Sequence, residues 1–173
     1  MAFWSDSGAS PKLSYRWTAT LGSTSNKIET YTLKSFQKPS LDVAVAEYYN
    51  INDVAFKPGM LTWDPLEVLL VDAEGAATNN SSILYNIIRD SGYIQNSLGQ
   101  PQSAIVKKAA SNALGGQITF NQINAANVDI ERWTLINPFV TKVNFGQATY
   151  TTDEILTVAM TIRYDYAKYE KLA

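Results

Sequence analysis

Two pairs of carboxylates have the type and spacing that acid–base chemistry would use. Asp129 and Glu131 lie two residues apart in a predicted strand, and Asp72 and Glu74 lie two apart near the end of another. Residues at this spacing share one face of a strand, as the acid and base of a glycosidase would need beside a sugar cleft. A solvated strand edge or turn explains both pairs more simply. No catalytic residue is therefore predicted.

The absence of two residue types narrows the chemistry further. The 173 residues include neither His nor Cys, which removes the commonest general base, the commonest metal ligand and every thiolate. Residues 71–75 (VDAEG) lack the oxygen-rich loop of a calcium site. Gly115 and Gly116 are not followed by the Lys-Ser/Thr of a phosphate-binding loop. We expect no metal, no cofactor and no enzymatic activity.

The tryptophans leave one binding role open. An exposed platform of a carbohydrate-binding β-sandwich could be built from Trp4, Trp17, Trp63 and Trp133. Trp17 alternates with apolar residues, however, as a residue of a strand core does. A carbohydrate-binding or carbohydrate-cleaving β-sandwich remains the alternative from a different functional class.

Length and composition indicate one globular domain. The chain is 46% hydrophobic and 17% charged, with a net charge of −2, so it lacks the basic surface of a dedicated nucleic-acid binder. It has no apolar run long enough for a bilayer and no secretory signal, so no membrane partner is expected. We predict a flexible N-terminal arm over residues 1–12 and a single domain over 13–173. Phe3 and Trp4 are either frayed terminal residues or an anchor that docks on a neighbouring subunit.

Apolar and polar residues alternate through much of the chain, which is typical of β-strands. Residues 13–21 and the strand from residue 28 are predicted to form a hairpin. Pro58 and Gly59 are predicted to end a strand as a turn, and Pro65 to lie at a sheet edge or bulge. Further strands are predicted at 41–49, 54–60, 61–71, 117–123, 129–136 and 138–146.

Two segments favour helices. Residues 79–92 carry an apolar stripe at helical spacing, with Ser81 or Ser82 as the cap and Gly92 at the end. Residues 103–116 form either a second, Ala-rich helix capped by Ser103 or a loop. The fold class is therefore mainly β: an antiparallel barrel or sandwich with one or two short flanking helices.

The last strand is predicted to be unusually long. Residues 154–170 (EILTVAMTIRYDYAKYE) alternate over most of their length, and a single strand of that length would span about 55 Å. One face is apolar. The other carries small or polar residues, including Thr157, Ala159, Thr161 and Arg163.

Residues 131–167 resemble the tail tube proteins of contractile-tailed bacteriophages. The resemblance rests on a Trp-containing strand, an Asn-Pro-Phe step at 137–139, a turn near TTDE and a long last strand ending in Tyr-Asp. It is better over 129–167 than over 13–93, where the hairpins and the helix follow the same order. It fades between 94 and 128, a possible insertion or loop.

The resemblance implies hexameric rings that join their sheets into a continuous inner barrel and stack into a tube. It also implies a sheath around the tube, a tape-measure protein inside it during assembly, and a baseplate initiator at its end. DNA would pass through without sequence-specific binding. The location would be the virion tail, assembled in the host bacterial cytoplasm. A baseplate tube initiator and the inner tube of a bacterial contractile injection system remain alternatives on the same fold.

Two groups of residues are expected to serve this assembly. We predict that the small-residue face with Thr157, Ala159, Thr161 and Arg163 lines the channel, because a smooth wall with few cations would not bind passing phosphates. Residues 38–59 are long for a hairpin and are either an axial contact between rings or an ordinary solvated hairpin. Ring-stacking candidates there are Lys38, Asp42, Glu47, Asp53 and Lys57.

Overall fold

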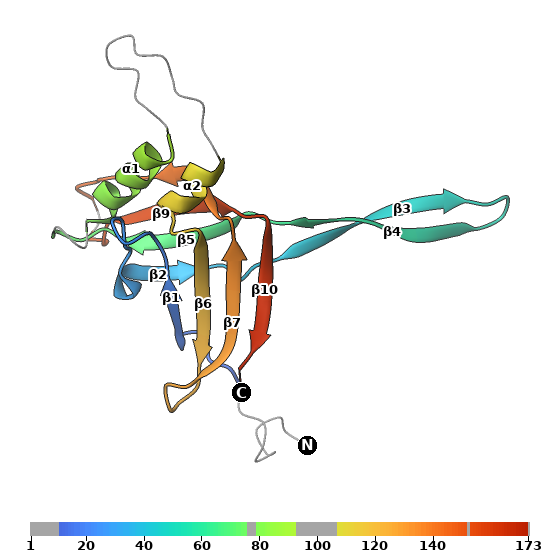
Figure 1. Ribbon diagram of the computed structural model, residues 1–173, viewed down its shortest axis with the longest axis horizontal. Helices are drawn as coiled ribbons and strands as arrows, with labels where there is room; N and C mark the ends of the chain where they lie inside the picture. Colours follow the sequence, from blue (N-terminus) through green and yellow to red (C-terminus); the bar gives the residue numbers. More distant parts are fainter. Residues whose placement is uncertain (1–10, 76–78, 93–106, 152, 173) are drawn as a thin grey trace, which may run out of the picture.

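A computed structural model describes residues 11–75, 79–92, 107–151 and 153–172 of the chain. The body consists of two antiparallel sheets packed face to face, and a two-stranded arm projects from it (Figure 1). The predicted mainly-β sandwich with short helices is confirmed. The predicted anchor residues Phe3 and Trp4 and the predicted cap Ser103 lie outside the described residues.

Each layer of the sandwich has four strands. The first sheet has the order β1 (Trp17–Thr20), β6 (Gln117–Ile123), β7 (Asp129–Ile136) and β10 (Tyr166–Lys171). The second has the order β2 (Leu33–Phe36), β5 (Leu66–Val71), β9 (Thr157–Arg163) and β8 (Phe139–Asn144). The segment 94–128, where the family resemblance fades, therefore contributes β6 to the middle of the first sheet.

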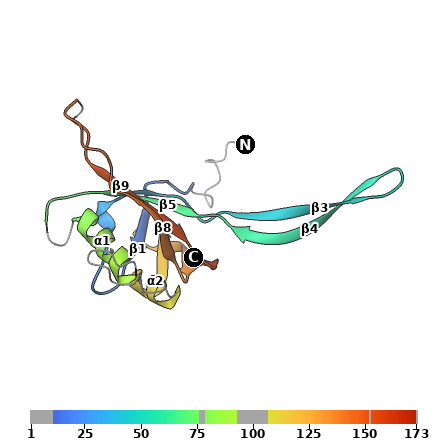
Figure 2. The ribbon, with the colours of Figure 1, turned by 90° about the horizontal axis from the view of Figure 1, so that it is seen from above.

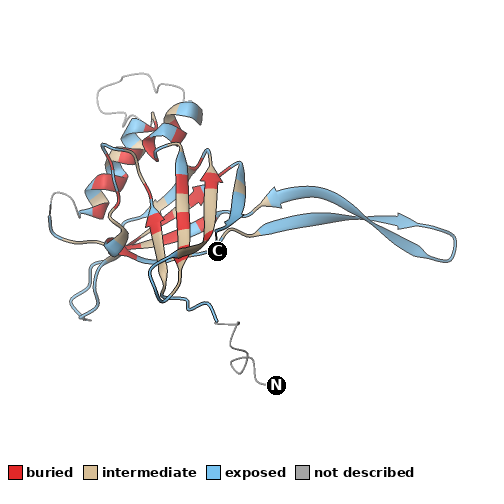
Figure 3. Cartoon of the chain, turned by 60° about the horizontal axis from the view of Figure 1, so that its bottom comes forward, coloured by how far each residue is buried: buried red, intermediate tan, exposed pale blue. Residues whose placement is uncertain are grey.

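The core lies between the sheets, where buried residues gather (Figure 3). Alternate residues of the inner strands point into it, as the period-two pattern requires. Its fully buried side chains include Leu70, Ile118, Phe120, Leu135, Met160 and Ile162. Burial of each contributes roughly 1.5–3 kcal/mol.

Two helices lie at one end of the sandwich (Figure 1). The first, α1 (Asn80–Asp90), buries Ile83, Leu84 and Ile87 against the core. Its N-cap is Asn79, whose side chain accepts from Ser82 N at 2.8 Å, so the prediction of a serine cap is wrong.

The second helix, α2 (Lys107–Ala113), is confirmed over its described part. It is followed by Gly115 and Gly116 at φ +83° and +76°, which favour glycine. Among the described residues, neither helix is long and apolar enough to cross a membrane.

The predicted long last strand is two strands in different sheets. Its alternation is correct over β9, where Val158, Met160 and Ile162 are fully buried, but not beyond it, where Tyr166 is 42% exposed and Ala167 packs against the core. After β9, however, the chain turns a corner at Asp165 and continues as β10 in the other sheet. Asp165 N donates to Ile136 O at 3.0 Å, and Asn137 Nδ2 donates to the Asp165 carboxylate at 2.9 Å. These hydrogen bonds fix the corner at Asp165, where the chain passes from the second sheet to the first.

The predicted hairpin between residue 13 and the strand from 28 is also wrong. β1 pairs with β6 and β2 pairs with β5, so the two strands belong to different sheets. The two segments are joined by the bridge between Leu21 and Ile28 and by a hydrogen bond from Thr30 Oγ1 to Ala19 O at 2.7 Å. A short 3₁₀ helix, η2 (Thr30–Thr32), then leads the chain into the second layer.

The arm is formed by β3 (Leu41–Tyr49) and β4 (Val54–Trp63), which pair only with each other among the described strands. Pro58 and Gly59 were predicted to form a turn, but β4 continues through both. Pro58 is tolerated because each strand of a two-stranded ribbon has one edge without a ladder partner. Pro65 lies between β4 and β5, so the prediction of one strand over 61–71 is wrong as well.

Candidate assembly surface

The arm stands away from the body in both ribbon views (Figures 1 and 2). Every residue of β3 is exposed, and in β4 only Trp63 at the root is partly buried. An isolated two-stranded hairpin is marginally stable at best in water, because nothing covers either face. Within the part of the chain that the structure describes, the arm therefore lacks the packing that normally stabilises a sheet.

The two faces of the arm differ sharply in chemistry. Strand pairs such as Val43 with Leu61 and Glu47 with Phe56 place these side chains on one side, since facing partners share a face. This apolar face consists of Leu41, Val43, Val45, Glu47, Tyr49, Val54, Phe56, Pro58, Leu61 and Trp63. The opposite, polar face carries Asp42, Ala44, Ala46, Tyr48, Ala55, Lys57 and Thr62. Continuous exposed apolar surface of this kind marks an interaction site.

A bulge keeps the apolar face continuous along the arm. The register moves from Val43 opposite Leu61 to Val45 opposite Pro58, so β4 holds one extra residue at this point. Gly59 lies here, and a Cβ on it would come within 2.9 Å of Ala44 O. Only glycine allows the two backbones to approach so closely without a shift.

The root of the arm is fixed to the body through Trp63 of β4, and its two strands are hydrogen-bonded to each other there. The ring of Trp63 packs at 6.0 Å from that of Tyr164, and Arg163 Nη1 donates to Trp63 O at 3.5 Å. Asp64 N donates to Ser40 O at 3.0 Å, and Ser40 Oγ donates to the Asp64 carboxylate at 2.8 Å. The direction in which the arm leaves the body is thus set by specific contacts.

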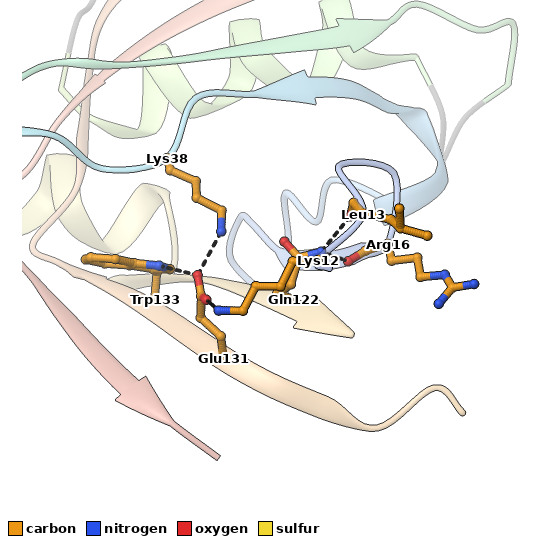
Figure 4. Close-up of polar contacts among 7 residues, drawn as sticks. All are labelled: Lys12, Leu13, Arg16, Lys38, Gln122, Glu131 and Trp133. Carbon is orange, nitrogen blue, oxygen red and sulfur yellow. Dashed lines mark hydrogen bonds and ion pairs between the residues drawn. The ribbon is translucent and has the colours of Figure 1, made fainter. Parts of the chain in front are cut away.

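A buried carboxylate ties the root to the first sheet (Figure 4). Glu131 is 5% exposed and accepts from Lys38 Nζ at 2.8 Å, from Trp133 Nε1 at 2.9 Å and from Lys12. Burial by itself would raise the pKa of Glu131. The hydrogen bonds from Lys12, Lys38 and Trp133 outweigh burial and lower this pKa to about 2. The carboxylate of Glu131 therefore binds both Lys38, at the arm root, and Lys12, near the first described residue.

The predicted carboxylate pairs are not catalytic pairs. Glu131 points into the sandwich, whereas Asp129 accepts from Asn121 at 3.0 Å on the outer face of the same sheet. The two do not share a face because a bulge after Gln122 adds a residue to β7 between them. In the other pair, Asp72 accepts from the backbone and hydroxyl of Ser81 at the start of α1.

The structure gathers most of the ring-stacking candidates on the arm. Asp42 and Lys57 lie on its polar face, Glu47 on its apolar face, and Asp53 at its tip. Lys38 instead lies at the root, bound to Glu131. Sequence reasoning missed the apolar face itself. The alternation of Val43 and Val45 with Ala44 and Ala46 indicated an apolar side of β3. The turn wrongly predicted at Pro58 prevented the matching apolar side of β4 from being recognised.

The channel candidates occupy the outer face of the second sheet. Thr157, Ala159 and Thr161 are half-buried and alternate with core residues. Register places Glu67 and Lys142 on either side of Thr161, so this face is mixed in charge. Arg163 is exposed at the arm root.

A groove of about 930 Å³ opens between the edge strands β1 and β2. We call it the β1–β2 groove; its lining includes Tyr15, Trp17, Tyr31, Lys34, Phe36 and Lys38. Trp17 and Phe36 meet edge to face at 4.7 Å, and Phe36 stacks on Phe120 at 4.2 Å. The three described tryptophans all pack against the core, so they do not form an exposed sugar-binding platform.

Comparison with known proteins finds solved structures with a similar fold. No family model matches the sequence, and a search of curated proteins finds no match. A chain in the cryo-EM structure of the anti-feeding prophage tube terminating cap is similar with a TM-score of 0.68 and 19% identity, over 99% of this chain and 100% of that chain. One in the anti-feeding prophage baseplate has a TM-score of 0.68 and 10% identity, over 94% and 97%.

A third similar chain comes from the sheath-tube complex of an extracellular contractile injection system, PVC, in its extended state. Its TM-score is 0.66 at 18% identity, over 94% of this chain and 93% of that chain. At sequence identities this low, the similarity shows a shared fold but not a shared role. The chain therefore has the fold that these components of contractile injection systems share.

Proposed function

We propose that this chain is a structural, non-enzymatic tube subunit of a contractile apparatus, assembling as hexameric rings that stack into a hollow conduit. The observation that carries the proposal is the arm, whose apolar face is exposed and covered by no described residue of the subunit. The fold similarity to chains of a sheath-tube complex, a cap and a baseplate supports the same role.

In the finer form of the proposal, the conduit is a phage tail tube through which DNA is ejected. Its partners are a sheath outside, a tape-measure protein inside during assembly and a baseplate initiator at one end. Assembly takes place in the host bacterial cytoplasm. Thr157, Ala159 and Thr161 line the channel, where a wall with few cations lets phosphates pass without releasing many counterions.

A second candidate is a terminal component of the same apparatus, such as a cap or a baseplate initiator. The observation that favours it is the match to the tube terminating cap, which covers 99% of this chain and all of that one. A terminal ring forms once and does not repeat, whereas a tube subunit stacks without limit. The two roles therefore differ in a measurable way.

Negative-stain electron microscopy of the purified full chain, over a range of concentrations, tests the proposal. Hollow tubes of uniform diameter support the tube role, and single rings that never stack support the terminal role. A chain that stays monomeric at every concentration, even with preformed tube ends added as seeds, would overturn both. Phe56→Lys on the apolar face should abolish assembly, whereas Ala55→Lys on the polar face should preserve it, because only the first places a charge in the contact.

A further inference from the structure

We propose that the β1–β2 groove of one copy is the receptor for the apolar face of a second copy's arm. This inference rests on the proposed self-assembly and adds to it the surface that receives the arm. It follows from three properties of the groove: its exposed aromatic rings, its free backbone edges and its charge.

The groove exposes aromatic surface that matches the arm. Tyr15 and Tyr31 are 70% and 74% exposed, beside the partly buried rings of Trp17 and Phe36. On the arm, Val45 and Phe56 are 65% and 68% exposed. Aromatic side chains presented over a hollow are typical anchors of protein interfaces, because they bury much area at little entropic cost.

Backbone hydrogen-bonding groups on both sides of the contact lack ladder partners. Among the described strands, β1 pairs only with β6 and β2 only with β5, so each has one edge without a ladder partner, although Ala19 O of β1 accepts from Thr30 Oγ1 at 2.7 Å. Each strand of the arm likewise has one free edge. A strand laid along such an edge satisfies these groups by β-augmentation.

The charges of the two surfaces are complementary. Glu47 is the one charged residue on the apolar face of the arm, all of whose residues the structure describes. In the groove, Glu29 pairs with Lys27 at 3.1 Å and Lys38 with Glu131 at 2.8 Å, which leaves Lys34. Neither Glu47 nor Lys34 forms an ion pair with any other residue that the structure describes. Docking places the Glu47 carboxylate, which accepts from the Tyr49 hydroxyl but has no cation beside it among the described residues, next to the Lys34 ammonium.

Docking of one copy's arm in the groove of the next copy can repeat from copy to copy. The arm extends outward from the body (Figures 1 and 2), whereas the groove begins near the arm root, where Lys38 lies, and continues between β1 and β2. Because the arm extends away from its own body, we expect it to dock on another copy, so that arm-to-groove docking is heterologous. Such a contact closes into a ring or continues as a filament, depending on the rotation between copies.

The absence of cysteine allows a crosslinking test without background. The full chain carrying Val45→Cys and Tyr31→Cys is assembled and treated with a short bismaleimide. One matched control moves the arm cysteine to the polar face, as Ala46→Cys with Tyr31→Cys. A second control moves the other cysteine to the outer face of the first sheet, as Val45→Cys with Thr134→Cys. We expect a ladder of covalent multimers from the first variant and far weaker ladders from both controls.

A charge exchange provides a second, independent readout. Glu47→Lys faces Lys34 with a like charge, so the concentration needed for assembly should rise by about tenfold or more. Adding Lys34→Glu restores the opposite pair and should return that concentration toward the original. Lys34→Glu combined with an unaltered Glu47 should be as impaired as the first variant.

The outcomes separate this inference from the proposed function. Crosslinking and rescue together support the groove as the receptor. Normal assemblies that crosslink no better than the controls, or a charge exchange without rescue, overturn the groove and leave the tube role standing. If the cysteine variant does not assemble, rescue by the charge exchange alone decides. An unaltered chain that never assembles overturns the tube role and this inference with it.

Discussion

The second sheet and the arm carry the same alternation of apolar and polar residues but opposite burial. In β9, Val158, Met160 and Ile162 are fully buried. In β3, Val43 and Val45 are 41% and 65% exposed. The pattern in each strand is that of a sheet with one covered face. The difference is that no described residue of the subunit covers the apolar face of the arm, which is why we propose that a second copy covers it.

Because core residues are buried in the monomer and arm residues are not, we expect the two regions to contribute to different free energies: the core to folding and the arm to assembly. A buried aliphatic side chain contributes roughly 1.5–3 kcal/mol relative to an exposed one. Residues of the core contribute it when the monomer folds. In the proposed assembly, residues of the arm would contribute it when copies meet, so equivalent substitutions in the two regions should act on different measurements.

The largest effect on folding is expected from truncation in the core. Leu70→Ala removes a fully buried side chain and should lower the free energy of unfolding by about 2–5 kcal/mol. Leu61→Ala makes the same change on the arm, where Leu61 is 52% exposed, and should alter monomer stability by no more than about 0.5 kcal/mol. Urea titration of the dispersed chain measures both. Equal losses would contradict the proposed division between body and arm.

The Glu131 contacts predict a dependence of stability on pH. The pKa of Glu131 is lowered to about 2 in the folded chain, so its contribution is present above the unfolded pKa of about 4.5 and is lost as pH falls toward 2. The shift corresponds to about 3 kcal/mol at neutral pH. Glu131→Gln should remove most of this dependence, as measured by denaturation between pH 6 and pH 2. An unchanged pH profile in the variant would contradict the role of these contacts.

The bulge of the arm offers a smaller effect, on assembly alone. Gly59→Val places a branched side chain within 2.9 Å of Ala44 O and should displace the two strands of the arm. We expect weaker assembly, by sedimentation, with unchanged thermal unfolding of the body. Gly116→Ala is the matched control: open space surrounds Gly116, but its φ of +76° strains alanine by about 1 kcal/mol, which affects folding and not assembly.

The smallest effect is expected at Arg163. Its bond to Trp63 O is long, at 3.5 Å, and exposed, so Arg163→Ala should change the free energy of unfolding by about 0.5 kcal/mol or less. Tube formation should continue if Arg163 faces the channel, as predicted. Loss of straight tubes without loss of stability would instead assign Arg163 to the orientation of the arm.

The sequence by itself determined the local features of this protein. Strand periods, the apolar stripe of α1 and the alternation over 157–164 depend on neighbours within a few residues, and they were predicted correctly. The absence of His and Cys likewise ruled out whole classes of chemistry without reference to any contact.

Only the tertiary structure decided which strands pair and which faces are covered. The corner at Asp165, the split of β1 and β2 between layers and the bulge between Asp129 and Glu131 all depend on partners far away in the chain. The same holds for the exposed apolar face of the arm, because alternation shows that a strand has an apolar side but not what lies against it. Burial is a property of the whole assembly, and a period of two residues cannot carry that information.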